Sequence, residues 1–236
     1  MKQCIKRISV LVSLLLAAPQ VTFSQYFQRL YEVDSGGWGW NIILQPDSSY
    51  YVFGLFFNYL HNQEFNFLHL SANGAVLRTS TLSHDSSFLT RGFPGQILPL
   101  PGSGYISPLN ILSFNTARTN SYSAAGMIKY NDAGDIVLFK TYVDSPHYDF
   151  VTACGIMSDG GNILSGARSF DTSSNFPGYI IRTDSMGDTL WTHTYQKNVN
   201  QWAIINNVLP LPDGRIVAGG VTTDWEYAGP PCSYRL

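Results

Sequence analysis

The residues of this chain with the clearest chemical potential are carboxylates and amides grouped around single glycines. Three such groups occur: Ser71-Ala-Asn-Gly74-Ala, Asn131-Asp-Ala-Gly134-Asp and Asp184-Ser-Met-Gly187-Asp. Clustered oxygen ligands suit a calcium ion, but the Gly74 group contains no carboxylate. A hairpin turn accounts for all three groups, because glycine adopts positive φ and Asp or Asn side chains bond back to loop amides. We therefore expect Gly74, Gly134 and Gly187 to be structural turn residues, with no metal site and no cofactor; calcium binding is the alternative.

Signatures of catalysis are missing from the sequence. The histidines show no His-x-x-x-His or Glu-x-x-His pairing of the kind that binds zinc: His61, His69, His84, His147 and His193. No Gly-x-Ser-x-Gly elbow supports a nucleophilic serine. The pairs His84-Asp85 and His147-x-Asp149 are predicted to be solvated loop residues rather than catalytic dyads. We predict no catalytic residue, although paired aspartates of a glycosidase leave no mark in a linear sequence.

Aromatic residues crowd one stretch: Trp38, Trp40, Tyr50, Tyr51, Phe56, Phe57 and Tyr59. Most of them are predicted to pack in the core, as aromatic side chains usually do. Trp38 and Tyr59 fall in expected loops, so they are the candidates for stacking on a sugar or on apolar peptide side chains. Phe139 and Trp191 follow the Gly134 and Gly187 turns at what we interpret as one repeat position, and both are predicted to pack between neighbouring repeats.

A two-part pattern repeats along the chain and predicts the elements that position these residues. The first part is a strand, a glycine turn and a strand, as in Tyr179 to Trp191. The second part is an apolar strand, a Pro/Asp/Gly turn and another apolar strand, as in Val208 to Gly219, with Asp159, Asp213 and Gly214 as turn residues. The turn positions of this second part lie 55, 57 and 54 residues apart: Asp47, Gly102, Asp159 and Asp213.

A period near 55 with four short strands per repeat is typical of a β-propeller blade. We predict an all-β propeller domain over residues 25–236, with blades of about 50–55 residues. It divides into a half-blade at 26–60, units at 65–115, 126–172 and 179–224, and the start of a further unit at 225–236. The half-blade includes a strand expected at 26–33.

About 3.5 to 4 blades are present, whereas propellers close with four to eight. An open arc leaves an edge strand and a blade face unpaired. The hypothesis that follows is a fragment of a longer protein; a tight four-bladed ring and self-association with a second copy are the alternatives.

Residues 1–24 have the pattern of a secretory signal peptide. Lys2, Lys6 and Arg7 precede an apolar stretch from Ile8 to Ala18, which is too short to span a bilayer. Cleavage is expected after Ser24, with a site after Ala18 as the alternative. No other segment approaches the length of a transmembrane helix.

Removal of the signal peptide changes the charge and the cysteine content. It takes away three of the 14 basic residues and none of the 16 acidic ones, which leaves 11 against 16 and a net charge of −5. This balance argues against nucleic acid or an anionic membrane as a partner. Cys4 leaves with the signal. Cys154 and Cys232 are predicted to be free thiols, although secretion also permits a disulfide between them.

The hairpin Leu209-Pro-Leu-Pro-Asp-Gly-Arg-Ile-Val-Ala-Gly-Gly220 resembles the repeated hairpins of secreted bacterial β-propeller proteins. The phrase that precedes it in those proteins matches Arg182, Asp184, Gly187, Trp191 and Tyr195. The resemblance covers nearly all of residues 26–224 and is specific for the repeat rather than for an activity. It implies a propeller fold and export to the cell surface or medium, in many relatives by the type IX pathway. The C-terminal sorting domain of that pathway is not found in this sequence.

The predicted function is a secreted or surface-exposed, non-catalytic binding or scaffold module. Its ligand is an unidentified extracellular protein or carbohydrate contacted by loops at one rim. The alternative is an extracellular glycoside hydrolase or lyase on the same scaffold, and a structural spacer is a third reading. Fold analogy does not choose among them, because propellers host all three.

Overall fold

The computed structural model of the chain describes residues 31, 37–57, 63–82, 88–89, 97–102, 104–114, 121–142, 148–169, 176–196 and 201–224. These residues form strands and turns, and none of them lies in a helix. Accordingly, the described part has no helix with the length and hydropathy of a membrane span. The predicted signal peptide, Cys232 and, apart from Tyr31, the strand expected at 26–33 lie outside the described residues.

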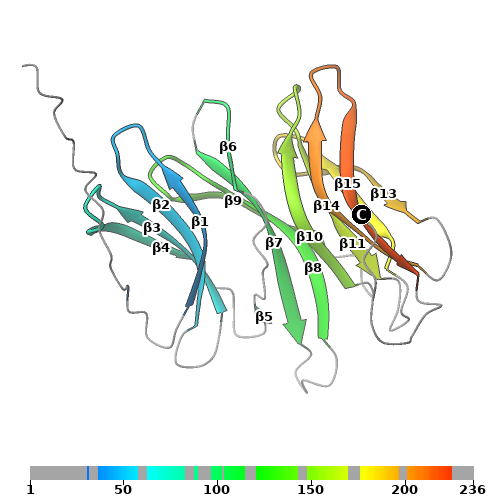
Figure 1. The fold of residues 1–236 in the computed structure, drawn as a ribbon, viewed down its shortest axis with the longest axis horizontal. Coiled ribbons are helices and arrows are strands. Elements are labelled where there is room, and N and C mark those ends of the chain that lie inside the picture. Colours follow the sequence, from blue (N-terminus) through cyan, green and yellow to red (C-terminus); the bar gives the residue numbers. More distant parts are fainter. Residues whose placement is uncertain are drawn as a thin grey trace, which may run out of the picture.

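The strands form four antiparallel sheets that follow one another in chain order (Figure 1). The first sheet has the order β1-β2-β3-β4, with bounds Gly37–Leu44, Tyr50–Phe57, Gln63–Leu70 and Val76–Leu82. In the second sheet β5 (Phe88–Leu89) and β6 (Leu98–Pro99) both pair with β7 (Tyr105–Phe114), which is followed by β8 (Ser121–Tyr130) and β9 (Ile136–Tyr142). The third sheet has the order β10-β11-β12-β13, with bounds Tyr148–Ile156, Asn162–Ser169, Gly178–Thr183 and Thr189–Tyr195. The fourth is a pair, β14 (Gln201–Pro210) and β15 (Ile216–Asp224). The prediction of an all-β chain with four-stranded antiparallel sheets is confirmed.

The boundaries between the sheets are offset by half a repeat from the boundaries of the units expected from the sequence. The hairpin β1–β2 pairs with β3 and β4, so it belongs to the same sheet as the start of unit 65–115. Likewise, β8 and β9 complete the sheet that β7 begins. A repeat period defines the length of the unit and not the strand at which a sheet starts, which explains the difference.

A β-bulge recurs in the first strand of three sheets. The register skips one residue between Gly39 and Asn41, between Val151 and Ala153, and between Ile205 and Asn207. A glycine on the next strand lies across each bulge: Gly54, Gly166 and Gly220. A Cβ atom at Gly166 or Gly220 would collide with a backbone carbonyl of the bulged strand. Glycine at these positions therefore makes room for the bulge.

Among the described residues the hydrophobic core forms three layers, each between two consecutive sheets. Tyr51 and Phe67 of the first sheet pack with Leu109 and Ile128 of the second. The second layer joins residues of the second and third sheets: Ile106, Ala125, Met127, Val151, Cys154, Leu164, Tyr179 and Ile181. The third joins the third and fourth sheets: Ala153, Met157, Ile163, Ile180, Ile205 and Val208. Each inner sheet is therefore apolar on both faces, and the sheets stack face to face.

Candidate functional site

The hairpin turns lie together at one end of the sheets, which we call the turn end. They are residues 45–49, 71–75, 100–104, 131–135, 157–161, 184–188 and 211–215. Each closes with a hydrogen bond from the amide of its first residue to the carbonyl of its last, for example Ser71 to Ala75 at 2.8 Å. Gly74, Gly134 and Gly187 hold φ values of 78°, 81° and 81° in these turns, a conformation that glycine adopts without a steric penalty. Gly214 has a φ of 85° in the last turn.

Two turn glycines also contact the preceding sheet. A Cβ atom at Gly134 would fall on the ring of Phe67 in β3, and one at Gly187 would come within 3.0 Å of Met127 in β8. Phe67 and Met127 occupy equivalent positions, each seven residues before the turn glycine of its own sheet. The glycine turns are therefore contact points between neighbouring sheets as well as chain reversals.

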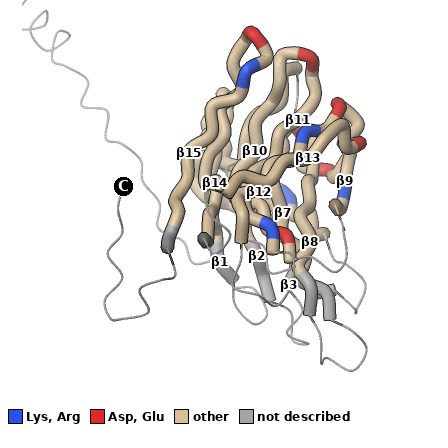
Figure 2. Tube along the Cα trace, turned by 90° about the vertical axis from the view of Figure 1, so that its right-hand side faces the viewer, with Lys and Arg blue, Asp and Glu red and all other residues tan. Residues whose placement is uncertain are grey.

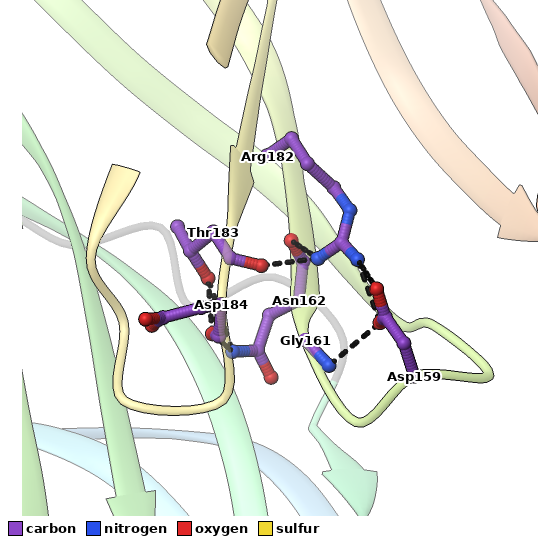
Figure 3. A network of polar contacts seen from close by, with 6 residues as sticks. All are labelled: Asp159, Gly161, Asn162, Arg182, Thr183 and Asp184. Atoms are coloured by element: carbon purple, nitrogen blue, oxygen red, sulfur yellow. Dashed lines mark hydrogen bonds and ion pairs between the residues drawn. The ribbon is translucent and has the colours of Figure 1, made fainter. Parts of the chain in front are cut away.

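A buried guanidinium ties two turns of the third sheet together (Figure 3). Arg182 of β12 donates from Nη2 to both carboxylate oxygens of Asp159 at 2.6 Å, and from Nη1 to the carbonyls of Asn162 and Thr183. Asp159 also accepts from the amide of Gly161 at 3.0 Å. The Asn162 side chain donates at 2.9 Å to the carbonyl of Asp184 in the neighbouring turn. Charge-assisted hydrogen bonds of this kind are stronger than neutral ones, so Asp159 holds turn 157–161 against β12.

The acidic side chain in this network makes the stability of the third sheet pH-dependent. The hydrogen bond from Gly161 and the bond from Arg182 lower the pKa of Asp159 from its ordinary value of 3.8. A carboxylate with a lowered pKa in the folded state stabilises the fold above its unfolded pKa, and this contribution is lost as the pH falls through the folded-state pKa. We expect the Asp159→Asn variant to lose less stability than the wild type below about pH 4. Urea unfolding at stepped pH tests this, and parallel pH profiles for the two proteins would contradict it.

Charged side chains at the turn end bridge neighbouring sheets. Ion pairs join Arg78 of the first sheet to Asp135 of the second, and Lys140 of the second to Asp188 of the third. The Lys129 ammonium donates to the carbonyl of Ser185 at 2.8 Å, and its burial lowers its pKa. Figure 2 shows charged residues on the hairpin tips of successive sheets.

The carboxylates considered above as calcium ligands therefore have protein partners. Asp135 pairs with Arg78 and also accepts from Asn131, and Asp188 pairs with Lys140. Asp184 accepts from the amide of Asp188 at 2.8 Å. Over the described part of the chain, no three His, Cys, Asp or Glu side chains gather in a metal-binding group.

The opposite end, which we call the loop end, carries a buried ion pair in the third sheet. Arg168 of β11 donates to both oxygens of Asp149 in β10, at 2.8 and 2.5 Å. It also donates to the Tyr179 hydroxyl at 2.7 Å, and its guanidinium lies 3.9 Å from the centre of that ring. The two charged side chains are only 8% and 2% exposed. The expectation that Asp149 is a solvated loop residue is wrong, because it belongs to β10 and its carboxylate is neutralised by Arg168.

Of the two residues predicted to bind a ligand, the structure describes the backbone of Trp38. Trp38 lies in β1 rather than in a loop, and it pairs with Leu55 of β2. Tyr59 follows β2 by two residues and lies outside the described residues, as do His84, Asp85 and His147. The register places the backbone of Trp38 beside Leu55, close to the end of β2 at Phe57.

Phe139 and Trp191 both pack between sheets, but they are not equivalent residues. Phe139 pairs with Ile128 and packs in the first layer, whereas Trp191 pairs with Arg182 and packs in the third. The register makes Leu138 the equivalent of Trp191. A shift of one residue places a strand side chain on the other face of its sheet, which accounts for the error.

The Cys154 side chain is fully buried in the second core layer. Burial raises its pKa to about 12, so the side chain behaves as a small apolar residue.

Sequence reasoning assigned no contacts to the basic side chains that precede the glycine turns, and it missed the tyrosines that bridge sheets. His69, Lys129 and Arg182 each lie five residues before a turn glycine, a spacing that the sequence shows. His69 lies 3.0 Å from the Ser49 hydroxyl in the first sheet, and so takes the place that Arg182 takes in the third. Tyr142 donates at 3.0 Å to the carbonyl of Gly187 in the next sheet; no sequence signal marks that bond.

Comparison with known proteins gives no family assignment. No protein-family model matches the chain, and no curated protein sequence matches it. Among solved structures, the chain is similar to that described as "Crystal structure of an ACO/RPE65 chimera", with a TM-score of 0.38 and 12% sequence identity. The match covers 74% of this chain and 47% of that chain, so this chain spans about half of that protein's length. A likeness at this TM-score assigns neither fold nor function.

Proposed function

We propose that this chain is a secreted or surface-exposed β-propeller module that binds an extracellular ligand without catalysis. The sheets are its blades: they repeat with a period near 55 residues, stack face to face and share one set of interface positions. The pattern of residues 1–24 supports export.

The contrast between the two ends of the sheets carries the binding proposal. At the turn end the described polar side chains join neighbouring turns and sheets, as Arg182, Lys140 and Lys129 do. At the loop end the backbone of Trp38 in β1 pairs with Leu55 of β2, and Tyr59 follows β2 in the sequence. Tryptophan and tyrosine supply large contact areas with few rotatable bonds, and they dominate many binding sites. We therefore assign ligand contact to the loop end, with Trp38 and Tyr59 as stacking residues.

Binding to immobilised chitin, xylan and mucin tests this proposal. We expect one of these probes to retain the protein, and the Trp38→Ala and Tyr59→Ala variants to bind it at least about tenfold more weakly. The matched control is Met186→Ala, which removes an exposed apolar side chain from the turn end and should leave binding unchanged. Equal retention of all four proteins would contradict the assignment to the loop end.

The same experiment separates the alternatives. Release of reducing sugar from the bound polysaccharide would favour the glycoside hydrolase or lyase instead of a binding module. Loss of retention on addition of EDTA, restored by calcium, would place a calcium ion in the module.

A further inference from the structure

The repeat allows one interface position to be compared in all four sheets. The reference points are the turn residues of the second part of the repeat, which are Asp47, Gly102, Asp159 and Asp213. Four positions after them lie Tyr51, Ile106, Ile163 and Val217. The first three are core residues, exposed by 7% or less, whereas Val217 of β15 is 53% exposed. Val217 thus lies on the face of the last described sheet that would contact a following sheet. Leu209 of β14, which pairs with Val217, is exposed on the same face.

A second position shows the reverse pattern. The residue five positions before each turn residue is Ile42, Ile97, Cys154 or Val208. The last three are exposed by 8% or less, whereas Ile42 of β1 is 64% exposed, and Leu44 on the same face is also exposed. Ile42 thus lies on the face of the first sheet that would contact a preceding sheet.

These two positions meet in every core layer. Tyr51 packs in one cluster with Ile97, and Ile106 packs in the next with Cys154. In the third layer Ile163 packs with Val208. Continuation of the series pairs Val217 with Ile42, so the two exposed faces are the two halves of one further interface.

The first sheet already carries part of that interface. The Tyr31 hydroxyl donates to the carbonyl of Gly74 at 2.7 Å, as Tyr142 of the second sheet does to Gly187 of the third. Leu68 and Leu70 of β3 are buried, whereas Ile42 and Leu44 of β1 are exposed. The uncovered part of this face is therefore the side formed by β1. A two-stranded sheet such as β14–β15 matches it, because β14 and β15 are the equivalents of β10 and β11.

We propose that the β14–β15 face of one copy, centred on Val217 and Leu209, packs on the β1 face of a second copy, centred on Ile42 and Leu44. The two faces belong to the first and the last described sheets of the row (Figure 1), and a second copy offers each of them its complement. The contact is heterologous, and a second contact of the same kind closes two copies into a ring. Burial of the four aliphatic side chains removes two apolar end surfaces from water.

Single-face variants of the full chain test the proposal by sedimentation velocity. We expect the wild type to sediment as a dimer, and Val217→Asp or Ile42→Asp to raise the dimer dissociation constant at least about tenfold, because each variant places a charge in an apolar contact. The control is Val137→Asp. Val137 is exposed, and so are its equivalents Leu77 and Leu190, so this position belongs to no interface in the described sheets.

Mixing the two variants separates the proposed contact from other modes of association. In an equimolar mixture, the intact β14–β15 face of Ile42→Asp meets the intact β1 face of Val217→Asp, so a heterodimer forms through one contact. The wild type could also form open polymers through the same contact. Polymers that disappear in both variants would support the proposed contact as well as a dimer does. A monomeric wild type would overturn the proposal, as would a dimer insensitive to both substitutions or a mixture that stays monomeric. Val217 and Ile42 are exposed, so the substitutions should leave the fold intact, and circular dichroism checks this. Leu209→Asp and Leu44→Asp test the same two faces at a second position each.

Discussion

Replacement of Arg168 by methionine is expected to lower the free energy of unfolding by about 3–5 kcal/mol, the cost of leaving one member of a buried ion pair without its partner. Arg168 satisfies both oxygens of Asp149, and both side chains are nearly inaccessible to solvent. Methionine fills much of the same volume, so the loss reports the uncompensated carboxylate rather than a cavity. Urea denaturation followed by intrinsic fluorescence measures the change.

Two controls distinguish this explanation from a general effect of losing an arginine. The double variant Asp149→Leu, Arg168→Met removes both charges, and we expect it to recover most of the lost stability, since apolar replacements of buried ion pairs are often neutral or better. Arg215→Met breaks the exposed pair with Asp213 and should cost less than about 1 kcal/mol. If Arg168→Met is no more damaging than Arg215→Met, the buried pair does not stabilise the third sheet.

The features that could be predicted from the sequence are those determined by residues close together in the chain. A glycine next to Asp or Asn is a local signal for a turn, because glycine readily adopts the positive φ that such turns need. Residue types and order alone therefore predict the turns at Gly74, Gly134 and Gly187. The spacing of Asp47, Gly102, Asp159 and Asp213 likewise indicated four successive hairpins.

The features that escaped prediction depend on pairing between strands. Asp149 and Arg168 are 19 residues apart and meet only because β10 and β11 run antiparallel in one register. The assignment of Trp191 and Phe139 to one position failed for the same reason, because a shift of one residue exchanges the faces of a strand. Contacts between sheets, such as that of Tyr142 with Gly187, depend on both registers and on stacking.

The contact between sheets at a turn glycine gives the second large effect. Gly134→Ala is expected to lower the free energy of unfolding by about 2–5 kcal/mol, as the sum of about 1–2 kcal/mol for an L-residue at positive φ and about 1–3 kcal/mol for overpacking. The new methyl group would collide with the ring of Phe67. That ring is held by neighbouring rings, with centroids 4.8 Å away at Tyr51 and 5.2 Å away at Phe53.

Gly214→Ala separates the backbone contribution from the packing contribution. Gly214 has nearly the same φ, 85° against 81°, but a Cβ atom there meets nothing within 4 Å. This variant should therefore lose only about 1–2 kcal/mol. In a Phe67→Leu background the ring is gone, so the cost of Gly134→Ala should fall to the Gly214→Ala value, and the difference is the coupling energy between β3 and the turn of the next sheet. Equal costs for Gly134→Ala and Gly214→Ala in the wild-type background would mean that Phe67 yields to the methyl group, and that the glycine is required by the turn alone.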